Sequence, residues 1–261
     1  MLNEYTATSW NALQEFLFDI PFNPTLNRFR SGNVFRGLNS TAYRRMETSL
    51  MRLGGAYWDK ERHLIRNFRK YAYQNVDVGD SDWHWLPVGQ HYGVPTRLLD
   101  WTYSPYIALH FATSDLERMD KDGLIWRVDI DRTNQFLPQR LHGILNEEGA
   151  YVFTPELLEK AAADLAAFDR IGGEFALFLE PPSLDGRIVN QFALFSLMSS
   201  PRLRFDDWLD RFAVPYGKII IPKELKWEVR DKLDQANITE RVVYPGLEGL
   251  AAWLRRHYYT R

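Results

Sequence analysis

The order of apolar and polar residues predicts an α+β fold without regular βαβ alternation. Apolar runs bounded by Gly, Pro or polar residues predict strands at residues 33–37, 123–130, 175–179, 192–197, 218–221 and 241–244. Apolar residues at helical spacing predict helices at residues 10–18, 40–53, 58–73, 155–168, 223–235 and 247–258, with one more beginning at Pro105. Because helices dominate the first part and strands the later part, we expect a mostly antiparallel sheet with N-terminal and peripheral helices.

Residues 81–100 stand apart from these periodic segments. They are polar and aromatic, and Pro87, Gly89, Gly93 and Pro95 interrupt them. Such frequent interruption predicts an organised loop rather than a regular element. The helix that follows has Ser104 as its expected cap and Pro105 in its first turn.

Length and composition favour one domain. The 261 residues are 45% hydrophobic and contain no cysteine, and no Pro/Gly/Ser-rich linker divides them. We expect a single domain over residues 1–261, with a helical extension at 1–30 and a core at 31–261. Without cysteine there is no disulfide, thiolate nucleophile or Fe–S cluster, and a cytoplasmic location is expected.

Charge and hydropathy limit the kinds of partner that we expect. The chain has 32 basic and 34 acidic residues and a net charge of −2, so it is not a polycation that holds nucleic acid by bulk charge. No apolar stretch approaches the ~20 residues of a membrane span, and the N-terminus does not resemble a signal peptide. We therefore expect no membrane partner.

Several common catalytic motifs are absent from the sequence. It has no P-loop, no G-x-G-x-x-G, no H-E-x-x-H and no G-x-S-x-G. Of the six histidines, only His84 and His91 form a suggestive pair, and few carboxylates lie near them in sequence. We expect no metal site.

The first candidate for a ligand contact is Arg36, in the apolar segment Val34-Phe35-Arg36-Gly37. A buried guanidinium needs an acceptor because it does not lose its charge. Two acceptors are open: an internal carboxylate such as Asp100, or the phosphate or ribose of a ligand. Gly37 would allow a ligand or another backbone to approach closely.

The second candidate is the segment QHYGVPTRLLDWT at residues 90–102, which leads into Ser104 and the following helix. Polar groups gathered in a rigid loop beside a helix N-terminus are typical of a binding site. The alternative is a polar network that holds a long loop to the core, with Asp100 bonded to Arg97 or Arg36. The candidate ligand-binding residues here are Gln90, His91, Tyr92, Thr96, Arg97, Asp100, Trp101, Thr102 and Ser104.

These motifs resemble the FRG domain, a family named after its Phe-Arg-Gly triplet. The resemblance rests on Phe35-Arg36-Gly37, the 90–102 segment and Ala108-Leu109-His110-Phe111-Ala112. It continues in the RIVNQ run at 187–191 and in YPGLEGLA at 244–251, so it extends from about residue 30 to the end. It implies a single FRG domain of bacterial or phage-associated character, with a role in bacterial defence or conflict.

A weaker similarity connects the chain with ADP-ribosyltransferases of the arginine–serine–glutamate type. Phe35-Arg36-Gly37 is similar to their first motif, and Thr102-Tyr103-Ser104 with the following helix is similar to their second. The third motif should supply a Glu near 187–195, where this chain has Gln191. The similarity implies a split sheet and NAD as the bound nucleotide, with Arg36, Gly37, Arg187 and Gln191 among the ligand contacts.

For such a transferase the candidate catalytic residues are Arg36, His91, Asp100 and Gln191. Gln supplies a hydrogen bond but no negative charge, and loss of one electrostatic stabiliser costs ~10²–10³ in rate. Either another carboxylate replaces it, with Asp100, Glu180 and Asp185 as candidates, or the site binds a nucleotide without turning it over.

Three interpretations therefore stay open. The first is an NAD-binding protein with transferase-like activity toward a protein or nucleic-acid acceptor. The second is a non-catalytic module whose aromatic pocket holds a base, a nucleotide or a nucleic-acid end. A basic surface on two neighbouring helices could help it to meet phosphates, and its residues are Arg44, Arg45, Arg52, Arg62, Arg66, Arg69 and Lys70. The alternative for this surface is a solvated helical face that Glu47, Asp59 and Glu61 partly neutralise. In the third the loop is structural, and replacing Arg97 or Asp100 mainly lowers stability.

Overall fold

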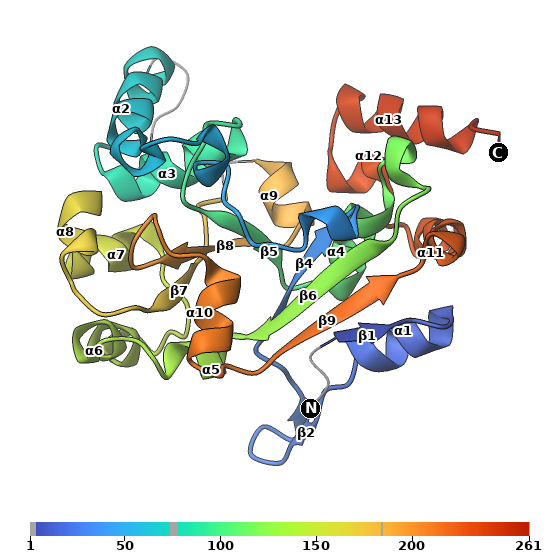
Figure 1. Ribbon diagram of the computed structural model, residues 1–261, viewed down its shortest axis with the longest axis horizontal. Helices are drawn as coiled ribbons and strands as arrows, with labels where there is room; N and C mark the ends of the chain where they lie inside the picture. The colour runs from blue at the N-terminus through green and yellow to red at the C-terminus, as the bar shows by residue number, and fades with distance from the viewer. Residues whose placement is uncertain (1–3, 74–77, 184, 261) are drawn as a thin grey trace.

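A seven-stranded mixed sheet forms the centre of the protein, in a computed structural model that describes residues 4–73, 78–183 and 185–260 (Figure 1). The strand order is β1-β9-β6-β4-β5-β8-β7; β1 pairs with β9 in parallel and every other neighbour is antiparallel. The strands of this sheet are β1 (Glu4–Thr6), β4 (Asn33–Leu38), β5 (Leu99–Thr102), β6 (Gly123–Asp129), β7 (Ala176–Leu179), β8 (Ala193–Met198) and β9 (Tyr216–Ile221). The predicted α+β class and the mostly antiparallel sheet are confirmed.

Helices surround this sheet at its faces and ends. They are α1 (Trp10–Leu17), α2 (Glu61–Ala72), α3 (Asp82–His91), α4 (Pro105–Thr113), α5 (Ile130–Asn134), α6 (Gln139–Glu148), α7 (Pro155–Ala161), α8 (Leu165–Asp169), α9 (Gly186–Asn190), α10 (Phe205–Arg211), α11 (Lys223–Gln235), α12 (Glu240–Val243) and α13 (Leu247–His257). Short 3₁₀ turns are η1 (Thr41–Tyr43), η2 (Met51–Leu53), η3 (Tyr57–Asp59) and η4 (Leu116–Arg118).

Two groups of helices cover one face of the sheet. Helices α1, α4 and α11 pack on β4, β6 and β9 through a cluster that includes Phe35. Helices α2, α3, α6, α7 and α8 pack on β7 and β8 through a cluster that includes Phe195. The pairs Phe35–Thr102 and Thr102–Ala193 put these residues on one face, which Phe195 shares two positions further on. The two helix groups therefore meet over β4 and β5.

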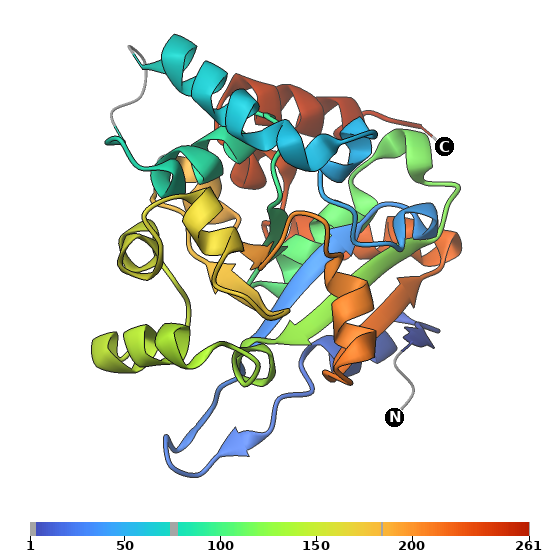
Figure 2. The ribbon, with the colours of Figure 1, turned by 60° about the vertical axis from the view of Figure 1, so that its left-hand side comes forward.

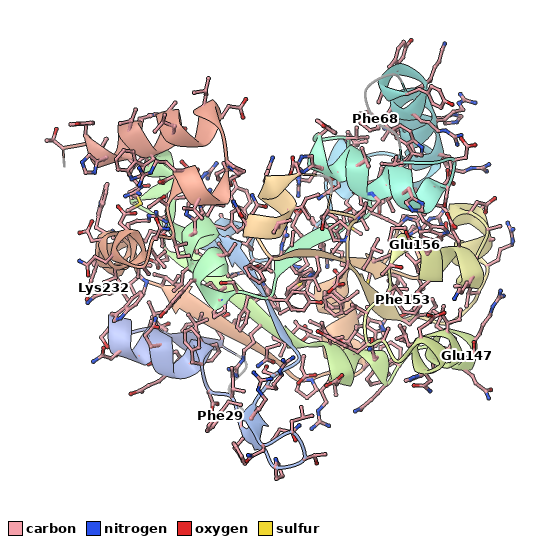
Figure 3. The ribbon with its side chains drawn as sticks, turned by 180° about the vertical axis from the view of Figure 1, so that it is seen from behind. Phe29, Phe68, Glu147, Phe153, Glu156 and Lys232 are labelled. Atoms are coloured by element: carbon pink, nitrogen blue, oxygen red, sulfur yellow. The ribbon has the colours of Figure 1, made fainter. Side chains whose placement is uncertain are left out.

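The opposite face is covered by α10. Phe205 and Trp208 of this helix pack in one cluster with Trp101 of β5, and the rings of Trp101 and Phe205 are 5.6 Å apart. Aromatic residues make up 15% of the chain, and these members of the group pack in the core. Phe153 is likewise buried among the helices, whereas Phe29 is 72% exposed on the β2–β3 hairpin (Figure 3).

The N-terminal stretch is more than helical. It contains α1, as predicted, but also β1, which joins the main sheet, and the separate hairpin of β2 (Phe22–Asn23) and β3 (Arg28–Phe29). Figure 2 shows this hairpin standing away from the rest of the molecule. The predicted division at residue 30 stays a prediction. In the described part of the chain, no helix combines the length and apolar character that a membrane crossing requires.

The helix predicted over 40–53 is wrong. Ser40 caps only the short turn η1, and a second turn, η2, follows after an irregular segment. Tertiary bonds hold that segment: Ser49 Oγ accepts from the Thr96 amide at 2.9 Å, and the Leu50 amide donates to the Thr96 carbonyl at 3.0 Å. These bonds replace the ones a continuous helix would make.

The loop predicted over 81–100 is also wrong, because it contains α3 and the start of β5. Pro87 lies inside α3, where it removes one helical hydrogen bond. The buried indoles of Trp83 and Trp85 compensate, since they donate to the carbonyls of Ala162 and Gly79, both at 2.8 Å. Packing therefore outweighs the propensity of proline.

Two further predictions are corrected near the C-terminal half. The predicted helix 155–168 is interrupted at Ala162, which is extended, and Asp164 caps the new helix α8. The predicted strand 241–244 is the helix α12, although it contains two valines. This helix packs on α13 and α9. The remaining predicted helices and strands are found, within a few residues of their expected ends.

Candidate functional site

A cavity of about 330 Å³ lies where β4 and β5 part. Their ladder contains one pair, Phe35 and Thr102, after which β4 continues with β6 and β5 with β8. The cavity opens between the two helix groups, on the face that Phe35 and Thr102 share. Its volume is within the range of ~300–1,000 Å³ that is usual for small-molecule sites.

Most of the residues predicted to bind a ligand come together here. Those that line the cavity are Arg36, Gly37, Gln90, His91, Asp100, Trp101, Thr102, Arg187 and Gln191. Four others, Tyr92, Thr96, Arg97 and Ser104, do not line it. Sequence reasoning missed the apolar walls, which are Phe35, Phe111, Ile188, Ala193 and Phe195. The apolar run at 192–197 was the available signal for two of these residues, Ala193 and Phe195.

Arg36 projects toward β5 across the gap between the strands. Its Nη1 donates to the main-chain carbonyl of Asp100 at 2.6 Å and lies 3.5 Å from the Asp100 carboxylate. Burial lowers the pKa of the Arg36 guanidinium, and the charge of Asp100 opposes that shift. Within the described residues, Nε and Nη2 have no hydrogen-bond partner, and the side chain remains 16% exposed. Arg36 therefore has an internal partner and still offers donors to a ligand.

Gly37 has a packing role at this position. A Cβ atom there would lie 1.9 Å from the carbonyl oxygen of Ala108 in α4. Gly37 therefore allows the backbone of α4 to approach closely, which is one of the two uses predicted for it. The helix that approaches is fixed by Ser104, whose Oγ accepts from the Ile107 amide at 3.4 Å.

A chain of side-chain hydrogen bonds holds the Asp100 carboxylate. Thr96 Oγ1 donates to Gln90 Oε1 at 2.6 Å, and Gln90 Nε2 donates to Asp100 Oδ1 at 3.0 Å. Thr96 thus acts behind the cavity wall rather than in it. Because the side chain of Asp100 is 61% exposed, its carboxylate faces the open side of the site.

Helix α9 brings Arg187 and Gln191 to the opposite wall. The helix begins at Asp185, whose Oδ1 accepts from the amides of Arg187 and Ile188 at 2.9 and 3.2 Å. The Arg187 guanidinium lies over the Tyr244 ring, 5.0 Å from its centroid. Gln191 Nε2 donates to the Val243 carbonyl at 3.1 Å, so α9 is tied to the end of α12.

His91 lies at the edge of the cavity, at the last position of α3. Its Nε2 is 2.8 Å from Asp185 Oδ2, while Tyr92 next to it is 63% exposed and packs on Phe68. Of the three carboxylates considered as replacements for a catalytic Glu, Asp100 lines the cavity and Asp185 contacts His91. The third, Glu180, accepts a hydrogen bond from the Tyr103 hydroxyl at 2.7 Å and does not line the cavity.

Arg97 belongs to a separate, buried ion-pair cluster. Its Nε lies 2.7 Å from Glu61 Oε2, and Asp169 pairs with its Nη atoms. The side chains of Arg97 and Glu61 are 4% and 1% exposed. Burial by itself lowers the pKa of the Arg97 guanidinium, but the charges of Glu61 and Asp169 raise it above its ordinary value. Asp100 therefore bonds Arg36 and not Arg97.

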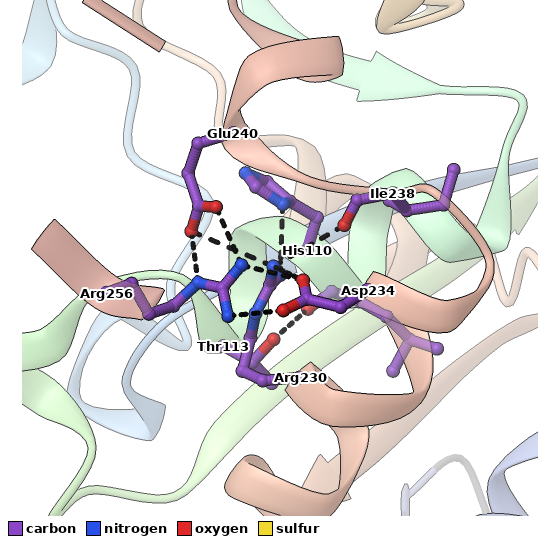
Figure 4. A network of polar contacts seen from close by, with 8 residues as sticks. His110, Thr113, Arg230, Asp234, Ile238, Glu240 and Arg256 are labelled. Atoms are coloured by element: carbon purple, nitrogen blue, oxygen red, sulfur yellow. Dashed lines mark hydrogen bonds and ion pairs between the residues drawn. The ribbon is translucent and has the colours of Figure 1, made fainter. Parts of the chain in front are cut away.

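A second buried network supports α12 and hence the α9 wall (Figure 4). Arg256 of α13 binds Glu240 and Asp234, with Nε 2.7 Å from Glu240 Oε1. Arg230 Nη1 lies 3.0 Å from Nδ1 of His110, and burial together with the Arg230 charge lowers the pKa of His110 to about 3. His110 is therefore neutral and accepts from Arg230 at ordinary pH.

Neither the cavity nor its surroundings hold a cluster of metal-ligating side chains. Among residues 4–73, 78–183 and 185–260, no three His, Asp or Glu side chains are placed to hold a metal ion. His84 lies 3.2 Å from Glu156 and is separate from the cavity.

Fold and site together define an α+β protein with a small cavity at a parting of its sheet, flanked by two arginines. Residues 31–121, from just before β4 to just after η4, match the family model of the FRG domain. These residues match the FRG domain that the motifs predict, and Arg187 and Gln191 lie beyond the matched segment. Searches of the curated proteins and of the solved structures gave no match. The similarity to ADP-ribosyltransferases stays a prediction.

Proposed function

We propose that the cavity at the β4–β5 parting binds an anionic nucleotide of the NAD type. The observation that carries this proposal is the state of Arg36, which keeps free N–H donors beside a cavity of ligand size. Arg187 lines the same cavity from α9. Two planar guanidinium groups are suited to phosphate oxygens, which they bind through parallel N–H donors.

The remaining lining suits the uncharged parts of such a ligand. Phe35, Phe111, Ile188 and Phe195 supply apolar surface, while Gln90, Thr102 and Gln191 supply polar groups. A lining that combines apolar surface with placed polar groups is suited to a planar ring and a sugar. Asp100 lines the same cavity, with its carboxylate 3.5 Å from Arg36 Nη1.

In the transferase form of this proposal, Asp100 takes the electrostatic role of the missing Glu. Transfer breaks the C1′–N glycosidic bond, and its electron pair leaves with nicotinamide. A protein or nucleic-acid nucleophile attacks C1′ and loses a proton. The exposed carboxylate of Asp100 would stabilise the positive charge that develops on the ribose. Its hydrogen bond from Gln90 holds it in place.

Calorimetric titration of the protein with NAD tests the proposal. Loss of a charge-assisted hydrogen bond costs ~1.5–3 kcal/mol, so Arg36→Ala should weaken binding by about 10- to 150-fold. Arg255→Ala, which removes an equal charge from α13, is the matched control and should bind as the wild type does. Equal binding by Arg36→Ala and wild type, or no binding of NAD by the wild type, would contradict the proposal.

Release of nicotinamide from bound NAD distinguishes a transferase from a module that only binds. We expect Asp100→Asn to retain NAD binding and to lose ~10²–10³ in the rate of release. Binding without release by the wild type would support the non-catalytic alternative and overturn the role assigned to Asp100.

A further inference from the structure

A second cavity, of about 700 Å³, lies between α2, α8 and the segment after β8. Trp58 of η3 and Arg62, Arg66 and Arg69 of α2 line it, together with Arg202 from the segment after β8. It touches α3 at Asp82, whereas the first cavity touches α3 at Gln90 and His91. Eight residues of helix span ~12 Å, so the two cavities are separate sites at the two ends of α3.

The arginines of this second cavity are incompletely neutralised. Arg69 pairs with Asp80, but in the described residues no carboxylate lies within 4.0 Å of Arg62, Arg66 or Arg202. Asp169, which also lines the cavity, is occupied by Arg97, which leaves Asp59 and Asp82 as the remaining acids there.

The spacing of the arginines along α2 also brings like charges close together. Arg62 and Arg66 are four residues apart on one helix, an arrangement of like charges that destabilises a helix unless an anion lies between them. An anionic ligand would remove this repulsion.

An aromatic platform lies next to these charges. The Arg202 guanidinium lies over the Trp58 ring, 4.1 Å from its centroid. Both groups are planar, and bases of single-stranded nucleic acids stack on aromatic rings and on arginine planes. Phosphate-binding cations beside a stacking platform match a nucleotide chain better than a free inorganic anion.

We propose that this second cavity binds single-stranded nucleic acid. Arg62 and Arg66 contact backbone phosphates, and the Arg202–Trp58 pair stacks with a base. The proposal does not depend on NAD binding in the first cavity, because the two sites have no arginine in common.

Fluorescence anisotropy with a labelled single strand of about 12 nucleotides, as DNA and as RNA, tests the proposal at several salt concentrations. Each phosphate contact on a single strand contributes ~0.7 to the slope of log K against log salt. Arg62→Ala/Arg66→Ala should therefore bind more weakly and lower this slope by ~1.4. Arg30→Ala/Arg255→Ala, which removes the same charge from exposed positions elsewhere, should leave the slope unchanged.

Two further variants locate the binding. Arg202→Gln removes the charge and the stacking plane without touching α2 and should weaken binding severalfold, which also covers the case in which the double variant fails to fold. Arg36→Ala, in the first cavity, should bind the strand as the wild type does. Thermal melting of each variant verifies that it is folded.

Three results would overturn the proposal. One is no binding of either strand by the wild type at low salt. Another is an equal loss in the control double variant, which would mean non-specific charge attraction. The last is displacement of the strand by an equimolar free mononucleotide, which would mean a small-ligand site.

Discussion

Two arginines of this protein, Arg97 and Arg36, differ in how fully their donors are engaged. Arg97 lies in a closed cluster with Glu61 and Asp169, and its side chain is 4% exposed. Arg36 lies at the parting of β4 and β5, where it contacts the main-chain carbonyl and the exposed carboxylate of Asp100. Arg36 lies in β4 and Arg97 lies just before β5. Both belong to motifs that the sequence predicts to bind a ligand.

The difference shows what separates a structural arginine from a ligand-binding one. A guanidinium has five donors, and Glu61 and Asp169 together engage Nε, Nη1 and Nη2 of Arg97. Around Arg36, Nη1 alone is engaged by the described residues, and a cavity takes the place of the missing acceptors. Unused donors beside empty volume indicate a ligand, whereas saturated donors indicate a fold contact.

The largest effect on stability is expected for Arg97→Ala. Removing one member of a buried ion pair leaves the carboxylate of Glu61 buried without its charge partner, which costs ~3–5 kcal/mol in the free energy of unfolding. Denaturant unfolding followed by circular dichroism measures this loss. Arg170→Ala, an exposed neighbour of Asp169, should change stability by less than ~0.5 kcal/mol. If Arg97→Ala lost as little unfolding free energy as Arg170→Ala, Arg97 would not be a structural arginine, and the contrast with Arg36 would fail.

An intermediate effect is expected from acid acting on His110, the buried acceptor of Arg230. Its pKa is about 3 in the folded protein and ~6.5 in the unfolded chain, so the unfolded chain binds the proton first as pH falls. Stability therefore falls below pH ~6.5, by ~1.4 kcal/mol per pH unit and ~2 kcal/mol at pH 5. His110→Asn keeps an acceptor near Arg230 and should lose this part of the pH dependence. An identical acid profile for the two proteins would show that His110 does not contribute.

The smallest effect on stability is expected for Asp100→Ala. The Asp100 side chain is 61% exposed, and Arg36 keeps its hydrogen bond to the main-chain carbonyl of the same residue. Exposed ion pairs are worth ~0–1 kcal/mol, so the free energy of unfolding should fall by no more than that. A loss of unfolding free energy as large as that of Arg97→Ala would mean that Asp100 is structural. It would also contradict the interpretation that Arg36 keeps donors free for a ligand.

Local signals in the sequence were sufficient for part of the fold and of the site. Strand β7 is a continuous apolar run, and β6 and β9 are mainly apolar segments that contain Arg127 and Lys218. Ser104-Pro105 begins α4 as its local chemistry predicts. The Phe-Arg-Gly and 90–102 motifs identify seven of the residues that line the cavity, because those residues are also close in sequence or fall on adjacent strands. The RIVNQ run at 187–191 supplies two more, Arg187 and Gln191.

Other features depend on partners that are distant along the chain. The segment predicted as a strand at 241–244 is helical, packed on α13 and α9, and Arg256 holds Glu240 at its first position. Helix α3 tolerates Pro87 because its buried tryptophans bond to residues outside the helix.

The sequence by itself determined the composition of the site: a charged side chain at position 36 that cannot shed its proton, and a dense polar segment ahead of a capped helix. Tertiary structure alone decided which arginine is saturated and which faces a cavity. The partners of Arg97 are 36 and 72 residues away in the chain, and the opening beside Arg36 exists only because two strands part after a single pair. Local propensities act over a few residues, whereas the pairing of buried charges is settled when distant segments pack together.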